Sequence, residues 1–243
     1  MGEYYFLRCA LPSLPDALGE AMPASFSELS GMIRRNVDPE DEDLFRAVLE
    51  SIDVINWEWF DQGRPVFIEG GTVDREDLEA TPRMLPLSIR AFHEERDRIS
   101  RRGYLHDRLW DRYLRDLFST AQAAGNHFLL LYLPWEIGLR NGLAAFRCRE
   151  KGLGAEEHVV LPEIQSRDAA SVVSQATSLR NPLHAERYLD EERLKAVFRA
   201  EGADPFSFDA ILAYVVRAMI YSRWDRMRQS FDFHAFLYSG GST

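Results

Sequence analysis

Four polar side chains on one predicted helix form the group in this sequence that could most readily carry chemistry. Glu136, Arg140, Asn141 and Arg147 lie within the stretch PWEIGLRNGLAAFRCREKG, among many large apolar residues. At about 100° per residue, Glu136, Arg140 and Arg147 fall on one face, and Glu136 and Arg140 have the i, i+4 spacing of an ion pair. Such a group could be an active site, a surface that binds another protein, or a set of polar contacts that fixes helices to one another.

The position of Asn141 favours the last of these interpretations. Asn141 lies beside the apolar stripe of the helix, which consists of Trp135, Leu139, Leu143 and Phe146. A half-buried amide without partners costs roughly 1–3 kcal/mol, so it must be hydrogen-bonded. We therefore expect Asn141 and Arg140 to bond to a neighbouring helix or to a loop carbonyl. Gly142 would let that neighbour approach closely. A partner-binding face and a catalytic site remain the alternatives.

A second charged group is a run of arginines before and at the start of another predicted helix. Its members are Arg96, Arg98, Arg101, Arg102 and Arg108. A solvated, arginine-rich turn explains such a run well. The alternative hypothesis is a basic surface that meets acidic loops of a partner protein. Replacement of Arg101 and Arg102 by Glu should then weaken assembly while leaving the fold intact.

Sequence motifs of common enzymes are missing. The chain has no glycine-rich phosphate loop, no HExxH and no G-x-S-x-G. His93, Glu94 and His106 could form a metal site, but a charged surface helix explains them better. The acidic run DPEDED, residues 38–43, lacks the glycine and the distant glutamate of an EF-hand calcium loop. The sequence thus predicts no catalytic residue, no cofactor and no metal, and the protein is not expected to be an enzyme.

The amino-acid composition indicates a globular protein and argues against some classes of binding partner. Of 243 residues, 46% are hydrophobic and 28% are charged, with a formal net charge of -10. This acidic balance argues against nucleic acid or an anionic membrane as the main partner. The two cysteines cannot build a disulfide framework or a zinc knuckle. With no signal peptide, and with an apolar run (128–135) too short to span a bilayer, a soluble cytoplasmic protein is expected.

The elements that must position these groups are predicted to be helices. Ser25 and Glu28 have capping-box spacing, and Asp38-Pro39 predicts the start of a long apolar helix that ends before Gly63. Residues 65–73 are either a short β-hairpin or a loop. Another helix is expected from about Thr81-Pro82. A further run from about Tyr104 to Lys151 is either two helices divided at Gly125 or one helix with a kink near Pro134.

Three more helices are predicted after residue 152. They cover 167–179, 190–200 with Asp190 as the N-cap, and 207 to about 237. The expected fold is therefore all-α. Its domain organisation is a single helical chain over residues 1–243, or two lobes of about 1–103 and 104–243.

The residues of the central helix also carry a family resemblance. The segment WEIGLRNGLAAFRCREKGLGAEEHVVLPE, from Trp135 to Glu163, resembles part of the central-stalk adaptor protein of the V/A-type rotary ATPases. In that adaptor, one helix carries an acidic residue, a polar cluster similar to Leu139-Arg140-Asn141, and a basic end. The beginning of the chain, YYFLRCALPSLP, and the end, RAMIYSRWDRMRQSFDFHAFL, are similar to a narrower bacterial family, whose genes lie among V-type ATPase genes where a recognisable stalk adaptor is absent.

The resemblance implies a mechanical role rather than a chemical one. The central-stalk adaptor is an all-helical, funnel-like spacer on the cytoplasmic face of the membrane rotor ring, where it receives the central shaft. The expected partners are therefore the ring and shaft proteins of the ATPase, and the expected location is the inner face of the plasma membrane, through protein contacts only. The chain is short for a three-lobed adaptor of this kind, so one lobe would be missing or reduced. A free-standing helical binding scaffold and a metal-dependent enzyme are the alternative functions.

Overall fold

A computed structural model describes residues 4–80, 85–95 and 105–230 of the protein. Within these ranges the chain forms ten α-helices and no β-strand, which confirms the predicted all-α fold. No helix in these ranges combines the length and the apolar character needed to cross a lipid bilayer. In chain order the helices are α1 (Tyr5–Ala10), α2 (Phe26–Arg34), α3 (Glu42–Asp61), α4 (Arg75–Ala80), α5 (Leu87–Glu95), α6 (Leu105–Ala124), α7 (His127–Glu150), α8 (Ala170–Ser178), α9 (Pro182–Ala200) and α10 (Phe208–Ser230).

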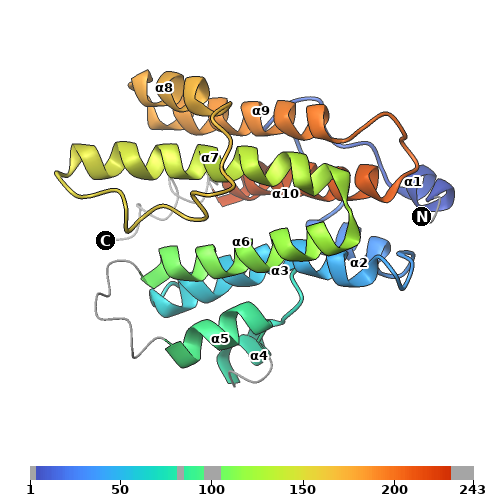
Figure 1. Ribbon diagram of the computed structural model, residues 1–243. Helices are drawn as coiled ribbons and strands as arrows, with labels where there is room; N and C mark the ends of the chain where they lie inside the picture. The colour runs from blue at the N-terminus through green and yellow to red at the C-terminus, as the bar shows by residue number, and fades with distance from the viewer. Residues whose placement is uncertain (1–3, 81–84, 96–104, 231–243) are drawn as a thin grey trace, which may run out of the picture.

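The longer helices are arranged in two layers (Figure 1). In one layer, α3 and α5 both pack against α6; in the other, α7, α8, α9 and α10 pack against one another. The layers are joined where α6 contacts α7 and where α2 contacts α10. A division into lobes at residues 103 and 104 would place α6 in a different lobe from α3 and α5, the helices against which it packs.

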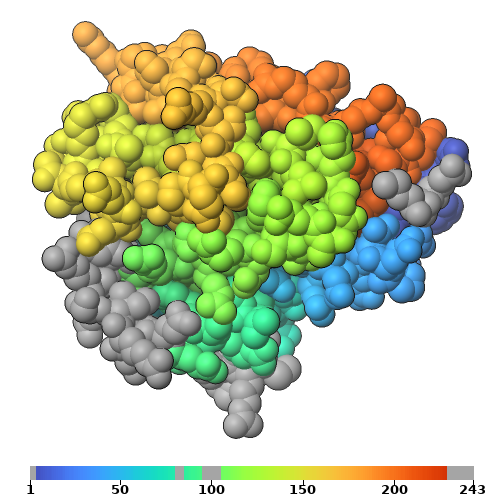
Figure 2. Space-filling view, viewed as in Figure 1, coloured from blue at the N-terminus to red at the C-terminus, as the bar shows by residue number. Residues whose placement is uncertain are grey.

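The larger of two hydrophobic clusters among the described residues extends through both layers. It includes Phe45 and Leu49 of α3, Leu109 of α6, Ile137 of α7 and Ile211 of α10, all of them fully buried. In the space-filling view, side chains of α6 and α7 meet along the join between the layers (Figure 2). The burial of this shared apolar surface is the main force that holds the layers together.

Of two helix starts predicted from the sequence, one is confirmed and the other is wrong. The capping box of α2 is confirmed, because the Ser25 hydroxyl accepts the Glu28 N–H and the Glu28 carboxylate accepts the Ser25 N–H. The start predicted at Asp38-Pro39 is wrong, since α3 begins only at Glu42. A contact with Tyr4 explains the delay: its hydroxyl accepts the Asp38 N–H at 3.2 Å and donates to Asp41 at 2.5 Å, which holds residues 38–41 in a turn.

The long run after Tyr104 is divided into α6 and α7 at Gly125, which was one of the two predicted arrangements. Gly125 has a φ of +63°, a left-handed conformation that glycine adopts easily. The next residue, Asn126, caps α7 by accepting the Leu129 N–H and also donates to Asp209 of α10 at 2.6 Å. Pro134 lies inside α7, which continues past it to Glu150.

Residues 65–73 form a loop, so the hairpin alternative is wrong. The buried amide of Asn56 bonds to both the N–H and the C=O of Ile68, each at 2.8 Å. The buried carboxylate of Asp53 accepts the N–H groups of Thr72 and Val73. These two side chains of α3 supply the hydrogen bonds that a partner strand would otherwise provide.

The start predicted for a helix at Asp190 is also wrong. The helix α9 begins eight residues earlier at Pro182, and Asn181 caps it by accepting the Leu183 N–H at 2.9 Å. An asparagine cap followed by proline is a strong helix start, and Asp190 lies inside the helix with its side chain buried.

Several predicted boundaries fall outside the described residues. These are the start at Thr81-Pro82 and the last residues of the final helix, from 231 to about 237. The predicted helix at 167–179 is confirmed as α8. The short helices α1 and α4 were not predicted, because six residues are too few to show a helical period.

Candidate functional site

Asn141 lies buried in the middle of α7, with only 4% of its surface exposed. Its amide nitrogen donates to the carbonyl of Val160 at 2.7 Å and to the side-chain oxygen of Gln165 at 2.9 Å. Its amide oxygen accepts the Val160 N–H at 2.8 Å. The predicted bond to a loop carbonyl is therefore confirmed, and Asn141 attaches the segment 151–169 to α7.

Glu136 bonds to a neighbouring helix rather than to Arg140. Its carboxylate accepts hydrogen bonds from Arg193 of α9 at 2.9 and 3.3 Å. The predicted i, i+4 ion pair between Glu136 and Arg140 is thus replaced by an interhelical pair. Burial would lower the pKa of Arg193, but the carboxylates of Glu136 and Asp190 outweigh this effect and raise it above its ordinary value.

Asp190 extends this pair to a third helix. It is 2% exposed, and it accepts hydrogen bonds from Arg193 at 2.8 Å, from Arg223 at 2.6 Å and from the Trp224 indole at 2.8 Å. A buried carboxylate with three donors is well satisfied, and removal of one partner from such a group is expected to be costly. The ion pairs of Glu136 and Asp190 therefore connect α7, α9 and α10.

Arg140 packs on an aromatic ring of the other layer. Its guanidinium carbon lies 3.9 Å from the ring centroid of Trp110 in α6, a cation–π contact. Burial lowers the pKa of this guanidinium, although an arginine remains charged at any physiological pH. The predicted contact with a neighbouring helix is present, but it is a stacking contact rather than a hydrogen bond.

The remaining predicted features of α7 are Arg147 and the close approach at Gly142. Arg147 is exposed, one turn before the end of the helix. A Cβ atom added at Gly142 would lie 2.7 Å from a methyl group of Val173 in α8, so the predicted close approach is confirmed. A second close approach, which was not predicted, occurs at Gly138, where an added Cβ would lie 2.1 Å from the carbonyl oxygen of Ser166.

These polar groups line a cavity of about 490 Å³ between the two layers. Its wall is apolar on the side of α3, where Ile52 and Ile55 lie, and charged on the side of α7, α9 and α10. The structure therefore brings Glu136, Arg140, Asn141 and Arg147 to one cavity. It adds polar residues from helices that the sequence pattern did not connect with them.

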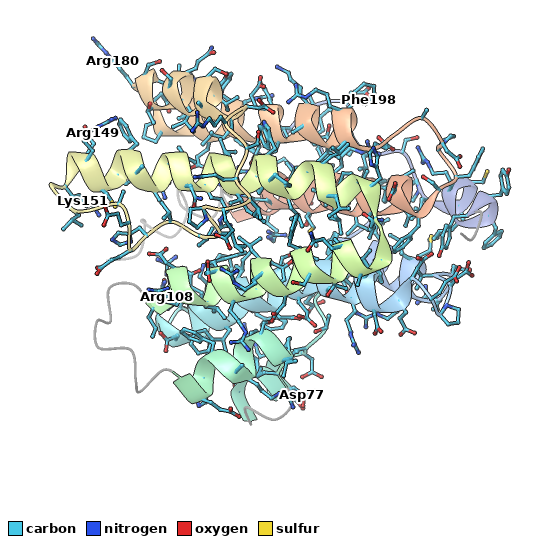
Figure 3. All side chains as sticks on the ribbon, viewed as in Figure 1. Asp77, Arg108, Arg149, Lys151, Arg180 and Phe198 are labelled. Atoms are coloured by element: carbon cyan, nitrogen blue, oxygen red, sulfur yellow. The ribbon has the colours of Figure 1, made fainter. Side chains whose placement is uncertain are left out.

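Only one member of the predicted arginine patch, Arg108, lies within the described residues. Arg108 is exposed in the first turn of α6 (Figure 3). Arg96, Arg98, Arg101 and Arg102 lie outside the described residues.

The metal site considered from the sequence is not formed. His93 and Glu94 are exposed, whereas the ring of His106 bonds to Asp61 at 3.1 Å. In the described part of the chain, only Asp38, Glu40 and Asp41 bring three potential ligand atoms within 4.8 Å of one another. Exposed acidic groups of this kind are common without a metal, and Asp41 already accepts the Tyr4 hydroxyl.

Sequence reasoning missed Asp190, Arg193 and Arg223. The charged run around Asp190 has the appearance of a solvated helix surface, and an aspartate before acidic residues is typical of an N-cap. One signal was present: Asp190 and Arg193 have i, i+3 spacing, which places them on one face of a helix. Their attachment to Glu136, 57 positions from Arg193, could not be read from that spacing.

Comparisons with known proteins identified a similar protein and a matching family model. One similar protein is described as "Uncharacterized protein" from Chlamydia muridarum (strain MoPn / Nigg) and is 27% identical over 154 residues. The match covers 61% of this chain and 57% of the relative, so it spans a little over half of that protein's length. A family model described as "Protein of unknown function (DUF2764)" matches residues 1–232. Because this match includes nearly the whole chain, the protein belongs to the DUF2764 family.

Proposed function

We propose that the protein is a non-catalytic adaptor in the central stalk of a V/A-type rotary ATPase. It would couple the membrane rotor ring to the shaft and would lie at the inner face of the plasma membrane through contacts with the ring and shaft proteins. The proposal starts from the resemblance of Trp135–Glu163 to the central-stalk adaptor of these ATPases. It is supported by an all-helical fold of the kind that such an adaptor requires.

The observation that carries the proposal is the way in which the segment Trp135–Glu163 is fixed within the molecule. Its polar groups bond to other parts of the chain at several separate points: Glu136 to Arg193, Asn141 to Gln165 at 2.9 Å, and His158 to Asp107 at 2.7 Å. At Gly138 and Gly142 the carbonyl of Ser166 and the side chain of Val173 lie directly against the backbone of α7. A part that transmits torque must resist relative sliding of its helices, and buried, satisfied polar networks give that resistance.

A further hydrogen bond lies just beyond this segment. Ser166, three residues after its end, donates its N–H to the Pro134 carbonyl at 2.8 Å. The segment 151–169 is also attached to α6, because Asp111 accepts the Leu161 N–H at 3.0 Å and Arg115 bonds to Glu163 at 2.9 Å. The segment thus links both layers, as expected of a body that must turn as one piece.

The proposal is tested by affinity purification of the full chain from its native cells in a mild detergent. We expect ring and shaft proteins of a V/A-type ATPase to be recovered with it, as identified by mass spectrometry. The isolated chain should not hydrolyse ATP. Recovery of the chain without any ATPase component would count strongly against the stalk role.

The contribution of the arginine patch can be measured in the same experiment. Arg108→Glu should reduce the recovery of partner proteins, since it reverses a charge on the surface proposed to meet their acidic loops. Arg180→Glu is a matched control, because Arg180 is also exposed but follows α8 in the other layer (Figure 3). Equal recovery with both variants would remove the patch from the interface while leaving the stalk role to the first experiment.

A further inference from the structure

The carboxylates on the wall of the central cavity all have cationic or hydrogen-bonding partners. Four acidic residues line it: Asp107, Glu136, Glu186 and Asp190. Glu136 and Asp190 bond to Arg193 and Glu186 bonds to Arg223 at 2.6 Å, while Asp107 bonds to the ring of His158. Each carboxylate of the wall therefore has a partner within the same wall, although two arginines and one histidine do not neutralise four carboxylates.

The arginines of the wall are not matched in the same way. Besides Arg193 and Arg223, the cavity is lined by Arg140, Arg147 and Arg226. Among the described residues, no carboxylate oxygen lies within 4.0 Å of any of these three guanidinium groups. Arg226 bonds instead to the neutral Ser222 hydroxyl, at 2.8 Å. With five arginines and four carboxylates, the wall has a formal charge of +1, and three of its guanidinium groups have no carboxylate partner.

Arg140 is the most deeply placed of the three. The ring of Trp110 covers one face of its guanidinium, and its N–H groups form no hydrogen bond with any described residue. The stacking fixes the plane of the guanidinium and leaves its edge, which carries the donors, for another group. A planar fork of donors matches the oxygens of a carboxylate or a phosphate, and hydrogen bonds between charged groups are stronger than neutral ones.

We propose that this cavity binds a small organic phosphate, with the phosphate group on the guanidinium of Arg140 and the apolar part toward Ile52 and Ile55 of α3. A phosphate is favoured over a carboxylate because three guanidinium groups without a carboxylate partner offer more N–H donors than the two oxygens of a carboxylate can accept, whereas a phosphate group has a third free oxygen. The volume of about 490 Å³ lies within the range of roughly 300–1,000 Å³ that is typical of small-molecule sites. The burial that lowers the pKa of Arg140 would be offset by a bound anion.

The proposal is tested by calorimetric titration of the full chain with phenyl phosphate, inorganic phosphate and benzoate. We expect phenyl phosphate to bind most tightly, because only it offers both a dianion and an apolar body. Arg140→Gln should weaken its binding by roughly tenfold or more, and Arg140→Lys should weaken it less, since the charge remains but the fork is lost. Arg149→Gln is the matched control, because Arg149 is exposed on the same helix and is not part of the wall (Figure 3).

Three results would overturn the proposal. They are the absence of phenyl phosphate binding at about millimolar concentrations, unchanged affinity in Arg140→Gln, or tighter binding of benzoate than of either phosphate. Circular dichroism checks that each variant is folded. If Arg140→Gln does not fold, Arg226→Gln takes its place, and unchanged affinity in that variant would again count against the site. The isolated chain suffices for these measurements, so their outcome is independent of the stalk role.

Discussion

At the scale of single residues, Asn141 shows how one buried amide can fix the position of a loop. It satisfies both polar groups of the Val160 backbone and bonds to Gln165, so three hydrogen bonds converge on one side chain. In a β-sheet or a helix these backbone groups would have backbone partners. Here the segment 151–169 has no regular structure apart from turns, and the side chain of a helix provides the partner instead.

Replacement of Asn141 by Ala should therefore destabilise the protein. The variant leaves the N–H and C=O of Val160 buried without partners, and we expect the free energy of unfolding to fall by about 1–3 kcal/mol. Urea unfolding followed by circular dichroism measures the change. Gln122→Ala, at an exposed position of α6, is the control and should leave the stability within about 0.5 kcal/mol. A fall no larger than that of the control would show that Asn141 is not needed to hold the loop.

A second residue, Glu50 of α3, predicts how stability depends on pH. Burial, reinforced by the nearby charge of Asp53, raises the pKa of Glu50 from 4.5 to about 7. A carboxyl group with a raised pKa binds its proton more tightly in the folded state than in the unfolded state. Its contribution is therefore fully present below about pH 4.5 and is lost as the pH rises through about 7.

Glu50→Gln tests this expectation because glutamine keeps the shape but cannot ionise. The free energy of unfolding of the wild type should decrease more steeply between about pH 5 and pH 8 than that of the variant. At the upper end of this range, the variant should be the more stable of the two. Glu79→Gln, at an exposed position of α4, should follow the wild type. Parallel curves for the wild type and Glu50→Gln would contradict the assignment.

At the scale of elements, the position of α7 depends on two glycines, which have no side chain and so let other segments pack directly against the helix backbone. Gly138 and Gly142 are one turn apart on this helix, and each faces a segment that follows it in the chain. The carbonyl of Ser166 approaches Gly138, while the same residue's N–H bonds to the carbonyl of Pro134. The backbone of the segment 151–169 is thus held against the backbone of α7, which only glycine permits.

Gly138→Ala should destabilise the protein even though alanine is the better helix former. An added Cβ would lie 2.1 Å from the Ser166 carbonyl oxygen, which is a backbone atom and cannot rotate away. We expect a loss of about 1–3 kcal/mol in the free energy of unfolding, as for other overpacked sites. Urea unfolding provides the measurement.

Gly31→Ala in α2 is the matched control for this prediction. Its added Cβ would meet only the flexible end of Arg35 at 3.4 Å, an ordinary contact. Helix propensity alone should then increase the stability by roughly 0.5–1 kcal/mol. If Gly138→Ala were stabilised to the same extent, the close approach of the segment 151–169 would be disproved.

At the scale of the whole molecule, the two layers share one core and are joined by polar contacts. Trp57 of α3 lies in one layer and Trp224 of α10 lies in the other, and both are buried. The cavity between the layers has walls from both of them. A shared core and a shared cavity make the two layers depend on each other for stability.

We therefore expect the chain to unfold in a single cooperative transition. Urea curves recorded by far-ultraviolet circular dichroism and by tryptophan fluorescence should coincide, because both probes report the same event. Variants that keep only Trp57 or only Trp224 would report each layer separately, and in each variant the fluorescence midpoint should coincide with the circular dichroism midpoint of that same variant. Different fluorescence and circular dichroism midpoints within one variant would favour two lobes of about 1–103 and 104–243.

Local patterns along the sequence were sufficient to predict much of the secondary structure. The apolar period, the Ser25–Glu28 capping box and the break at Gly125 depend on residues within a few positions of one another, and all of them are present in the structure. The requirement that Asn141 be bonded also followed from its place beside an apolar stripe. Such features are determined by sequence because a helix buries one face and must satisfy its own backbone.

Contacts between distant residues were decided only by the tertiary structure. The contact of Tyr4 with Asp41 delays the start of α3, and Glu136 pairs with Arg193 rather than with Arg140. Asp190 is a buried carboxylate inside α9 rather than the cap of a helix. In each case a charged or polar group had an acceptable local partner and a better one far away in the chain. The energy of a polar group depends on burial and on which groups surround it in space, and the spacing of residues along a helix contains neither.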